Sequence, residues 1–169
     1  MTASATPRGT AAGDVAVSWH EASMTTVDAL RAAGADGAGH ACPRCGGTDH
    51  GRPWARRDGM PIAASASRAG GRLVVAARPG SAPIGIDVER DDAVVPAEVV
   101  LHESEGGMDP LWAWVAKEAI VKHLGTGLRA DPASIRVFDF AVHRIPAPPG
   151  LVAALCTGAA PPAGPPRPA

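Results

Sequence analysis

Polar and apolar positions alternate, or recur at helical spacing, in short blocks along the chain. Residues 14–19 alternate well enough to predict a first strand. Residues 24–33 predict a short helix, with Thr25 or Thr26 as its N-cap. Residues 34–60 carry many glycines and no apolar period, so we expect a long, partly mobile or functional connection there.

The middle and the end of the chain are rich in β-branched and small apolar residues. Residues 62–65, 72–77 and 84–88 read as strands, and the Pro/Gly-rich turn between the last two predicts that they pair as a hairpin. Residues 135–145 and 151–156 predict closing strands.

Two further helices are indicated by their caps. Pro96 begins a short helical segment to about Leu101. Asp109 and Pro110 are a good cap and first position for a longer helix that ends at Gly125. The order of strand, helix, strands and then helices and strands again predicts an α+β fold over a doubly wound parallel sheet.

Composition bounds the size of the folded unit. With 169 residues and 46% hydrophobic residues, the chain suits one domain. Residues 1–13 and 158–169 are small, polar or Pro/Ala-rich, so we expect both to be disordered tails. The single domain then spans residues 14–157.

Charge and hydropathy exclude several partners. The formal net charge of −1 gives no bulk attraction to nucleic acid or to an anionic membrane. The longest apolar runs are far shorter than a bilayer span, and the N-terminus lacks the order of a signal peptide. We therefore expect a soluble, cytoplasmic protein.

Three cysteines make a disulfide framework improbable, but Cys42 and Cys45 have the spacing of half a zinc site. His40 and His50 lie nearby in sequence, so a closed tetrahedral site is one interpretation. The alternative is a glycine-rich loop with two reduced, inert thiols.

An acidic pair stands out on the strand predicted at 84–88 and just beyond it. Asp87 and Glu89 are two residues apart, so both carboxylates project to the same side. A hard divalent cation such as Mg²⁺ would offset their repulsion. A solvated strand end is the alternative.

The long helix carries the chain's only two lysines, against 14 arginines. Trp114, Glu118 and Lys122 recur every four residues and form one stripe, while Lys117 is offset from Glu118 by about 100°. An exposed Glu–Lys pair beside a core tryptophan would also explain the stripe. A third carboxylate and two ammonium groups facing the acidic strand would instead suit a pyrophosphate-containing substrate.

Two strings together resemble the signature of the 4′-phosphopantetheinyl transferase superfamily: GIDVE at 85–89 and WVAKEAIVK at 114–122. The loop at 125–128 is similar to the family's glycine-containing loop, and residues 51–53, Gly-Arg-Pro, resemble its Gly-basic-Pro step. The resemblance covers roughly residues 42–155. It implies the larger, two-halved type of this fold, with pseudo-symmetric halves at about 14–78 and 79–157 and a trimmed first half.

The resemblance also implies an activity, the Mg²⁺-dependent transfer of 4′-phosphopantetheine from coenzyme A to a serine of an acyl, peptidyl or aryl carrier protein, by a monomer. By that likeness the metal ligands are Asp87, Glu89 and Glu118. Glu118, directly or through a water, would take the serine proton, Lys122 would stabilise developing charge, and Lys117 would help to hold phosphate. The coenzyme contacts would come from Arg52, Pro53, Ser65, Ser67, Asp87, Lys117 and Lys122.

Several positions depart from the family pattern. Ser65-Ala66-Ser67 stands where relatives carry Ser-His-Ser, and Arg68 is one possible substitute for the missing imidazole. A degenerate member that binds carrier protein or coenzyme A without efficient transfer is therefore the alternative function. An acidic position between the two signatures matches either Glu103 or Glu105. Basic contacts to the far end of the coenzyme would fall to Arg31, Arg56 and Arg57.

Overall fold

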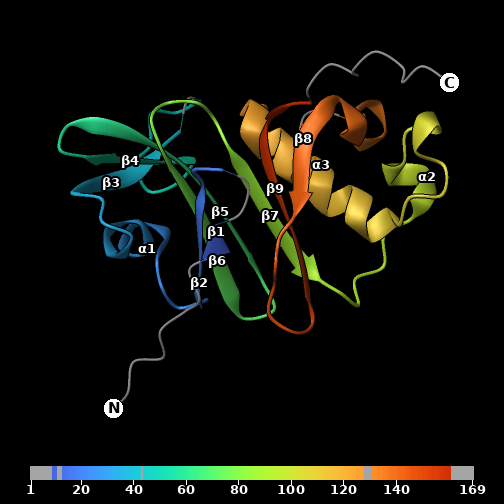
Figure 1. Ribbon diagram of the computed structural model, residues 1–169, viewed down its shortest axis with the longest axis horizontal. Helices are drawn as coiled ribbons and strands as arrows, with labels where there is room; N and C mark the ends of the chain where they lie inside the picture. The colour runs from blue at the N-terminus through green and yellow to red at the C-terminus, as the bar shows by residue number, and fades with distance from the viewer. Residues whose placement is uncertain (1–8, 11–12, 43, 128–130, 161–169) are drawn as a thin grey trace, which may run out of the picture.

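The computed structural model describes residues 9–10, 13–42, 44–127 and 131–160. The protein is a mixed α+β fold in which two antiparallel sheets lie side by side and helices cover the outer faces (Figure 1). The predicted α+β class is confirmed at this level.

The first sheet has six strands in the order β1-β2-β6-β5-β4-β3. Their bounds are β1 Gly9–Thr10, β2 Ala16–Glu21, β3 Gly37–Ala41, β4 Arg52–Arg57, β5 Met60–Ala69 and β6 Arg72–Pro79. All five pairings are antiparallel, and the β5–β6 hairpin turns at Gly70 and Gly71, both at positive φ.

The second sheet has three antiparallel strands in the order β7-β9-β8. The strands are β7 Gly85–Arg90, β8 Phe140–Arg144 and β9 Leu151–Ala159. The α-helices are α1 Thr26–Ala32, α2 Ala97–Val100 and α3 Pro110–Leu124, and the short 3-10 turns are η1 Glu103–Glu105, η2 Pro132–Ser134 and η3 Val137–Asp139.

One hydrophobic cluster is shared between the two sheets. Val17, Trp19 and Val74 enter it from the six-stranded sheet, and Ile86 and Leu155 enter it from the three-stranded sheet. Because apolar surface buried between the sheets stabilises both at once, neither sheet has a complete core alone.

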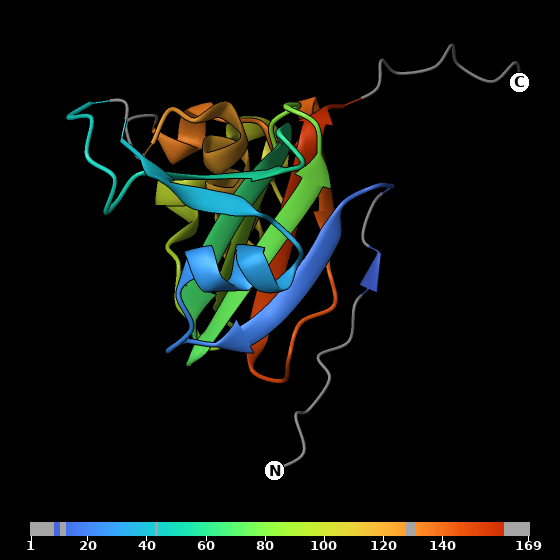
Figure 2. The ribbon, with the colours of Figure 1, turned by 90° about the vertical axis from the view of Figure 1, so that its left-hand side faces the viewer.

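Each sheet carries a helix on its other face. α1 lies across the six-stranded sheet (Figure 2), where Leu30 packs with Leu73 and Val75. α3 packs against the three-stranded sheet through Val115, Ala119 and Ile120, among others.

The boundaries of α3 agree with the sequence prediction. The Asp109 side chain accepts hydrogen bonds from the backbone N–H groups of Leu111 and Trp112, and Pro110 occupies the first turn. Gly125 has a left-handed φ of 72° and ends the helix. α1 is capped by Thr25, as one of the two predicted alternatives.

Two sequence predictions are wrong in this region of the fold. Residues 34–60 are not one loop, because they contain β3 and β4, paired from Gly37 with Arg56 to Ala41 with Arg52. The segments at 72–77 and 84–88 do not form a hairpin. β6 pairs with β2 and β5, and β7 pairs with β9. The two strands therefore belong to different sheets, which pack together through the shared core.

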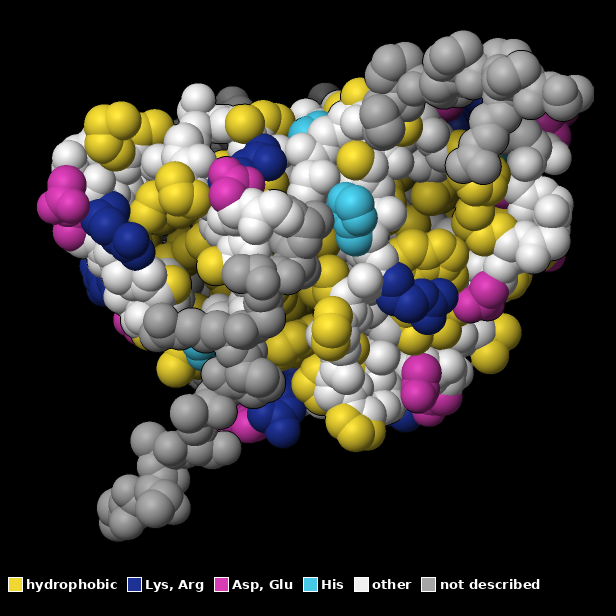
Figure 3. All heavy atoms as spheres, in the orientation of Figure 1, with side chains coloured by type: hydrophobic (Ala, Val, Ile, Leu, Met, Phe, Trp, Pro, Cys, Tyr) yellow, Lys and Arg dark blue, Asp and Glu magenta, His cyan; other side chains and the backbone are white. Residues whose placement is uncertain are grey.

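The predicted tails fall mostly on residues 1–8, 11–12 and 161–169, outside the described part of the chain. Two described segments extend past the predicted limits, namely β1, which pairs with β2, and the end of β9 at Ala159. Within the described residues, no helix is long and apolar enough to cross a membrane. Acidic and basic side chains are interspersed on the face seen in Figure 3, in keeping with the near-zero net charge.

Candidate functional site

The acidic strand lies directly beneath α3. Side chains alternate along β7, so Ile86 and Val88 enter the core shared by the two sheets. Asp87 pairs in register with Ala154 of β9, and Ala154 belongs to the cluster under α3. The side chain of Asp87 is therefore on the helix side of the sheet, and Glu89 follows it on the same face.

The carboxylate of Asp87 is buried, with 5% of the side chain exposed. Its Oδ1 accepts hydrogen bonds from Lys122 Nζ at 2.6 Å and from Ser67 Oγ at 2.7 Å. Its Oδ2 is also buried and has no hydrogen-bond partner among the described residues. A buried carboxylate oxygen without a partner is costly, so a cation or a hydrogen-bond donor at this atom would be stabilising.

Glu118 brings a second negative charge to the same place. Burial raises its pKa, and the nearby charge of Asp87 raises it further. The positive charge of Lys122 lowers the pKa of Glu118, and the negative charge of Glu89 raises it by a smaller amount. The charges of Asp87, Lys122 and Glu89 therefore all act on the Glu118 carboxyl group beside α3.

Close packing of α3 on β7 depends on Gly85. A Cβ atom at this position would lie 1.9 Å from the carbonyl oxygen of Ala119 and 2.5 Å from the backbone nitrogen of His123. Only a residue without a side chain allows the helix backbone so near to the strand. This approach puts Lys122 within reach of Asp87.

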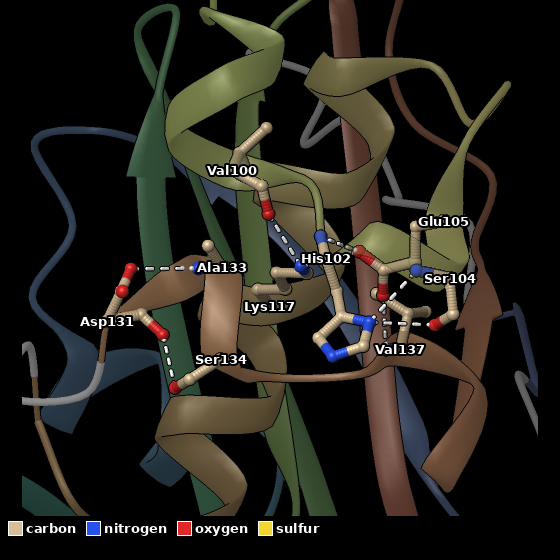
Figure 4. Close-up of polar contacts among 9 residues, drawn as sticks. All are labelled: Val100, His102, Ser104, Glu105, Lys117, Asp131, Ala133, Ser134 and Val137. Atoms are coloured by element: carbon tan, nitrogen blue, oxygen red, sulfur yellow. Dashed lines mark hydrogen bonds and ion pairs between the residues drawn. The ribbon is translucent and has the colours of Figure 1, made fainter.

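Lys117 is directed to a different part of the molecule. Its side chain is 2% exposed, and its Nζ lies 2.6 Å from Glu105 Oε2 and 2.6 Å from the carbonyl oxygen of Val100 (Figure 4). The structure therefore does not bring Lys117 together with Asp87. Of the two acidic candidates between the signatures, Glu105 is the buried one and Glu103 is exposed.

Glu105 is held from several directions. Besides Lys117, it accepts hydrogen bonds from the backbone N–H groups of Val137, at 2.7 Å, and His102, at 2.9 Å. Burial opposes the charged form, but these donors together hold the pKa of Glu105 below its ordinary value. The ion pair thus ties α3 to the segments before and after it.

The two serines of β5 approach β7 from the neighbouring sheet. Ser67 donates to Asp87, and Ser65 Oγ accepts a hydrogen bond from the backbone N–H of Ile86 at 3.1 Å. Ala66 lies on the opposite face of β5 and packs against the cluster under α1. Arg68 donates to the Met24 carbonyl at 2.8 Å, so it is anchored at the start of α1 and not beside Asp87.

Arg52 begins β4 and reaches the end of α3, where its Nη2 donates to the carbonyl oxygen of His123 at 3.4 Å. The favourable position of a cation at a helix C-terminus accounts for this contact. Pro53 follows at a half-buried position, paired with His40. Leu128, the end of the glycine loop in the resemblance, is outside the described residues.

The three arginines expected to serve the far end of a coenzyme make local contacts. Arg31 lies 3.8 Å from Asp28, and Arg57 donates to the carbonyl oxygen of Gly34 at 2.6 Å. Arg56 stacks over the ring of Trp54, 5.0 Å from its centroid. These contacts anchor them around β4 and α1.

Cysteine and histidine side chains gather elsewhere, in the loop between β3 and β4. Among the described residues, the group of metal-ligand atoms within 4.8 Å of one another is Cys42, Cys45 and His50. The carboxylates of Asp87, Glu89 and Glu118 are farther apart than this. Hydrogen bonds from the backbone of Cys45 and Arg44 and from the Cys45 thiol, with a smaller contribution from His50, lower the pKa of Cys42 to about 7.

Sequence reasoning missed two roles. The pairing of Glu105 with Lys117 had no signal beyond a charge-rich run, since burial at that position comes from the fold. Asp49, which contacts His50, was not singled out, although its place next to a histidine in a CxxC loop was visible.

A scan against protein-family models finds no match for the chain, and a search of curated proteins finds no relative.

Proposed function

We propose that the protein is a Mg²⁺-dependent 4′-phosphopantetheinyl transferase, which moves the phosphopantetheine arm of coenzyme A to a serine hydroxyl of an acyl, peptidyl or aryl carrier protein. In this proposal the two sheets correspond to the two halves of that family's fold. The division of strands supports this correspondence, because β6 ends the first sheet at Pro79 and β7 begins the second at Gly85.

The observation that carries the proposal is the meeting of the two signature strings at Asp87. One oxygen of this buried carboxylate is held by Lys122 and Ser67, and the other has no partner. A surface strand and a solvated Glu–Lys helix would not bury an acid in this way. The arrangement suits a site that receives a charged ligand.

The oxygen donors at this site suit a hard cation in type, although the three carboxylates are not gathered within 4.8 Å of one another. Asp87 Oδ2 supplies an oxygen with no partner among the described residues. Burial raises the pKa of Glu118, and the charges of Asp87 and, to a smaller extent, Glu89 raise it further. Oxygen ligands of this kind suit Mg²⁺, which would neutralise pyrophosphate oxygens of the coenzyme. Asp87, Glu89 and Glu118 would hold it.

The chain's own residues perform the acid–base work. The serine oxygen of the carrier protein forms a bond to the phosphorus that bears pantetheine. The bond between that phosphorus and the oxygen of adenosine 3′,5′-bisphosphate breaks, and the bonding electron pair leaves with that oxygen. Glu118 accepts the serine proton, for which a raised pKa makes its carboxylate a stronger base. Lys122, 30% exposed, stabilises charge on the leaving phosphate.

Lys117 has a positioning role in this proposal. Its ammonium already meets Glu105 and the Val100 carbonyl, and almost none of it is exposed. It stabilises the placement of α3 and hence of the adjacent Glu118. Arg52, at the end of the same helix, is the exposed cation better placed to meet phosphate.

Intact-mass measurement tests the proposal. Purified protein, Mg²⁺ and coenzyme A are incubated with a panel of apo acyl, peptidyl and aryl carrier proteins, and the mass gain of the phosphopantetheine arm is expected on at least one of them. Replacing Glu118→Gln should lower the rate about 10²- to 10⁴-fold, the usual effect of losing a general base. Glu98→Gln, the same change at an exposed residue of α2, should leave the rate unchanged.

Two outcomes would contradict the proposal. If no carrier protein gains mass, the proposed transferase activity is wrong. If the Glu118→Gln variant keeps full activity, Glu118 is not the general base. Calorimetry then tests the alternative of a binding protein without transfer. That function predicts carrier-protein binding with no measurable binding of Mg²⁺ and coenzyme A.

A further inference from the structure

The loop between β3 and β4 holds three side chains of one chemical type at one point. The ligand atoms of Cys42, Cys45 and His50 lie within 4.8 Å of each other, although the three residues span most of the loop. None of them takes part in the site at Asp87. Their convergence requires an explanation separate from the proposed transfer reaction.

The backbone of the loop is organised around the two thiols. Cys42 N–H donates to the Gly47 carbonyl, and Gly46 N–H donates to the Cys42 carbonyl, each at 2.9 Å. The turn needs the left-handed φ of 72° at Gly46, which glycine adopts without strain. Gly47 N–H then points at Cys45 Sγ, at 3.4 Å, and would stabilise negative charge on that sulfur.

The histidine is oriented by its neighbour. His50 Nδ1 lies 2.6 Å from an Asp49 carboxylate oxygen, and His50 Nε2 lies 3.3 Å from Cys45 Sγ. A carboxylate that accepts a hydrogen bond from Nδ1–H leaves the Nε2 lone pair directed to the thiols. Metal-binding histidines carry this same outer partner.

We propose that Cys42 Sγ, Cys45 Sγ and His50 Nε2 bind one Zn²⁺ ion, with a water molecule as the fourth ligand. Two thiolates and an imidazole select a borderline-soft ion such as Zn²⁺ over Mg²⁺. Cys45 and His50 are exposed and Cys42 is half-buried, so solvent reaches the fourth position.

A metal here would set the shape of the loop just before Arg52. Gly51, at φ 94°, closes the base of the loop, where a Cβ atom would lie 2.6 Å from the Ala41 carbonyl oxygen. Arg52 follows at once and contacts the last turn of α3 through His123. In this proposal the bound ion would hold the loop that leads directly into Arg52.

Metal content and Co²⁺ substitution test the site. Full-length protein without a histidine tag, kept reduced, is expected to contain one zinc per chain. The metal-free protein titrated with Co²⁺ should develop thiolate charge-transfer and tetrahedral ligand-field absorption. Cys42→Ser, Cys45→Ser and His50→Ala should each abolish stoichiometric zinc. Asp49→Asn should weaken affinity about 10- to 100-fold, as expected for an outer partner.

Two variants serve as controls. Cys156→Ala removes the remaining thiol, which is buried in β9, and Thr48→Ala changes an exposed loop residue that offers no thiol or imidazole. Both should keep full zinc content. The proposal is overturned if the reduced protein takes up neither Zn²⁺ nor Co²⁺, or if the Cys42→Ser variant binds as tightly as the unaltered chain. Neither result depends on transferase activity.

Discussion

The two lysines of α3 are five residues apart on the same helix and have different roles. Lys122 pairs with Asp87 and remains 30% exposed, whereas Lys117 is enclosed with Glu105. Lys122 can therefore contact a ligand from solvent, whereas Lys117 stabilises the fold. Both roles rest on an ammonium paired with a carboxylate, so the difference between them comes from burial.

The Lys117–Glu105 pair predicts a large stability effect. Glu105→Gln should lower the free energy of unfolding by about 3 to 5 kcal/mol, because it leaves a buried ammonium without its counter-charge. Urea denaturation measures the change. Glu103→Gln, an exposed residue of the same 3-10 turn, should stay within about 0.5 kcal/mol of the unaltered protein. Equal effects of the two changes would contradict the prediction.

The same carboxylate predicts a pH dependence. The pKa of Glu105 in the folded chain is below its ordinary value, so its contribution to stability is complete above the unfolded pKa of about 4.3. The contribution is lost as the pH falls through the lower, folded value. The stability difference between the unaltered protein and Glu105→Gln should therefore shrink below about pH 4. A constant difference would assign the effect to packing.

At the scale of elements, the contact between α3 and β7 makes the site at Asp87. The helix backbone passes directly over Gly85, and the carbonyl of Ala119 occupies the space where a side chain would be. The glycine of the GIDVE string thus has a packing role, as glycine in a strand often does where another backbone approaches closely.

Gly85→Ala should displace the helix. We expect a loss of about 1 to 3 kcal/mol or more in unfolding free energy, typical of overpacking, together with weaker ligand binding at Asp87. Thermal and urea unfolding measure the first effect. Gly158→Ala is the matched control on the neighbouring strand β9, where a Cβ atom meets nothing within 4 Å. An unchanged Gly85→Ala protein would show that the helix can shift at no cost.

Elements with a strong local signal were predictable. Asp109, Pro110 and Gly125 specify the limits of α3 through hydrogen bonds and backbone angles within a few residues. β3 and β4 escaped prediction because their residues, including Gly37 and His40, show no apolar alternation. They are strands because the sheet edge beside β5 provides their partners. The failed hairpin of 72–77 and 84–88 has the same cause, since a turn does not specify a strand's partner.

At the scale of the whole molecule, the shared core joins the two sheets. Hydrogen bonds from Ser67 to Asp87 and from Ile86 to Ser65 add polar contacts across the same boundary. We therefore expect the predicted halves, 14–78 and 79–157, to fold as one unit.

This arrangement predicts one cooperative unfolding transition. Tryptophan fluorescence reports on Trp19 in the shared core, on Trp54 in the first sheet and on the two tryptophans of α3, while far-UV circular dichroism reports on all elements. The two probes should give the same urea midpoint. Separate midpoints, or an isolated 79–157 fragment that folds, would show that the halves are independent domains.

The sequence by itself determined the α+β class, the limits of α3, and the shared side of Asp87 and Glu89, because alternation, helical spacing and caps act over short distances. The sequence also contains two charged strings, at 85–89 and 114–122, that together resemble the signature of one family. Only the tertiary structure decided that Lys122 meets Asp87 while Lys117 meets Glu105, and that Cys42, Cys45 and His50 converge. Those contacts depend on burial and on backbone approach between distant segments, which no local pattern records.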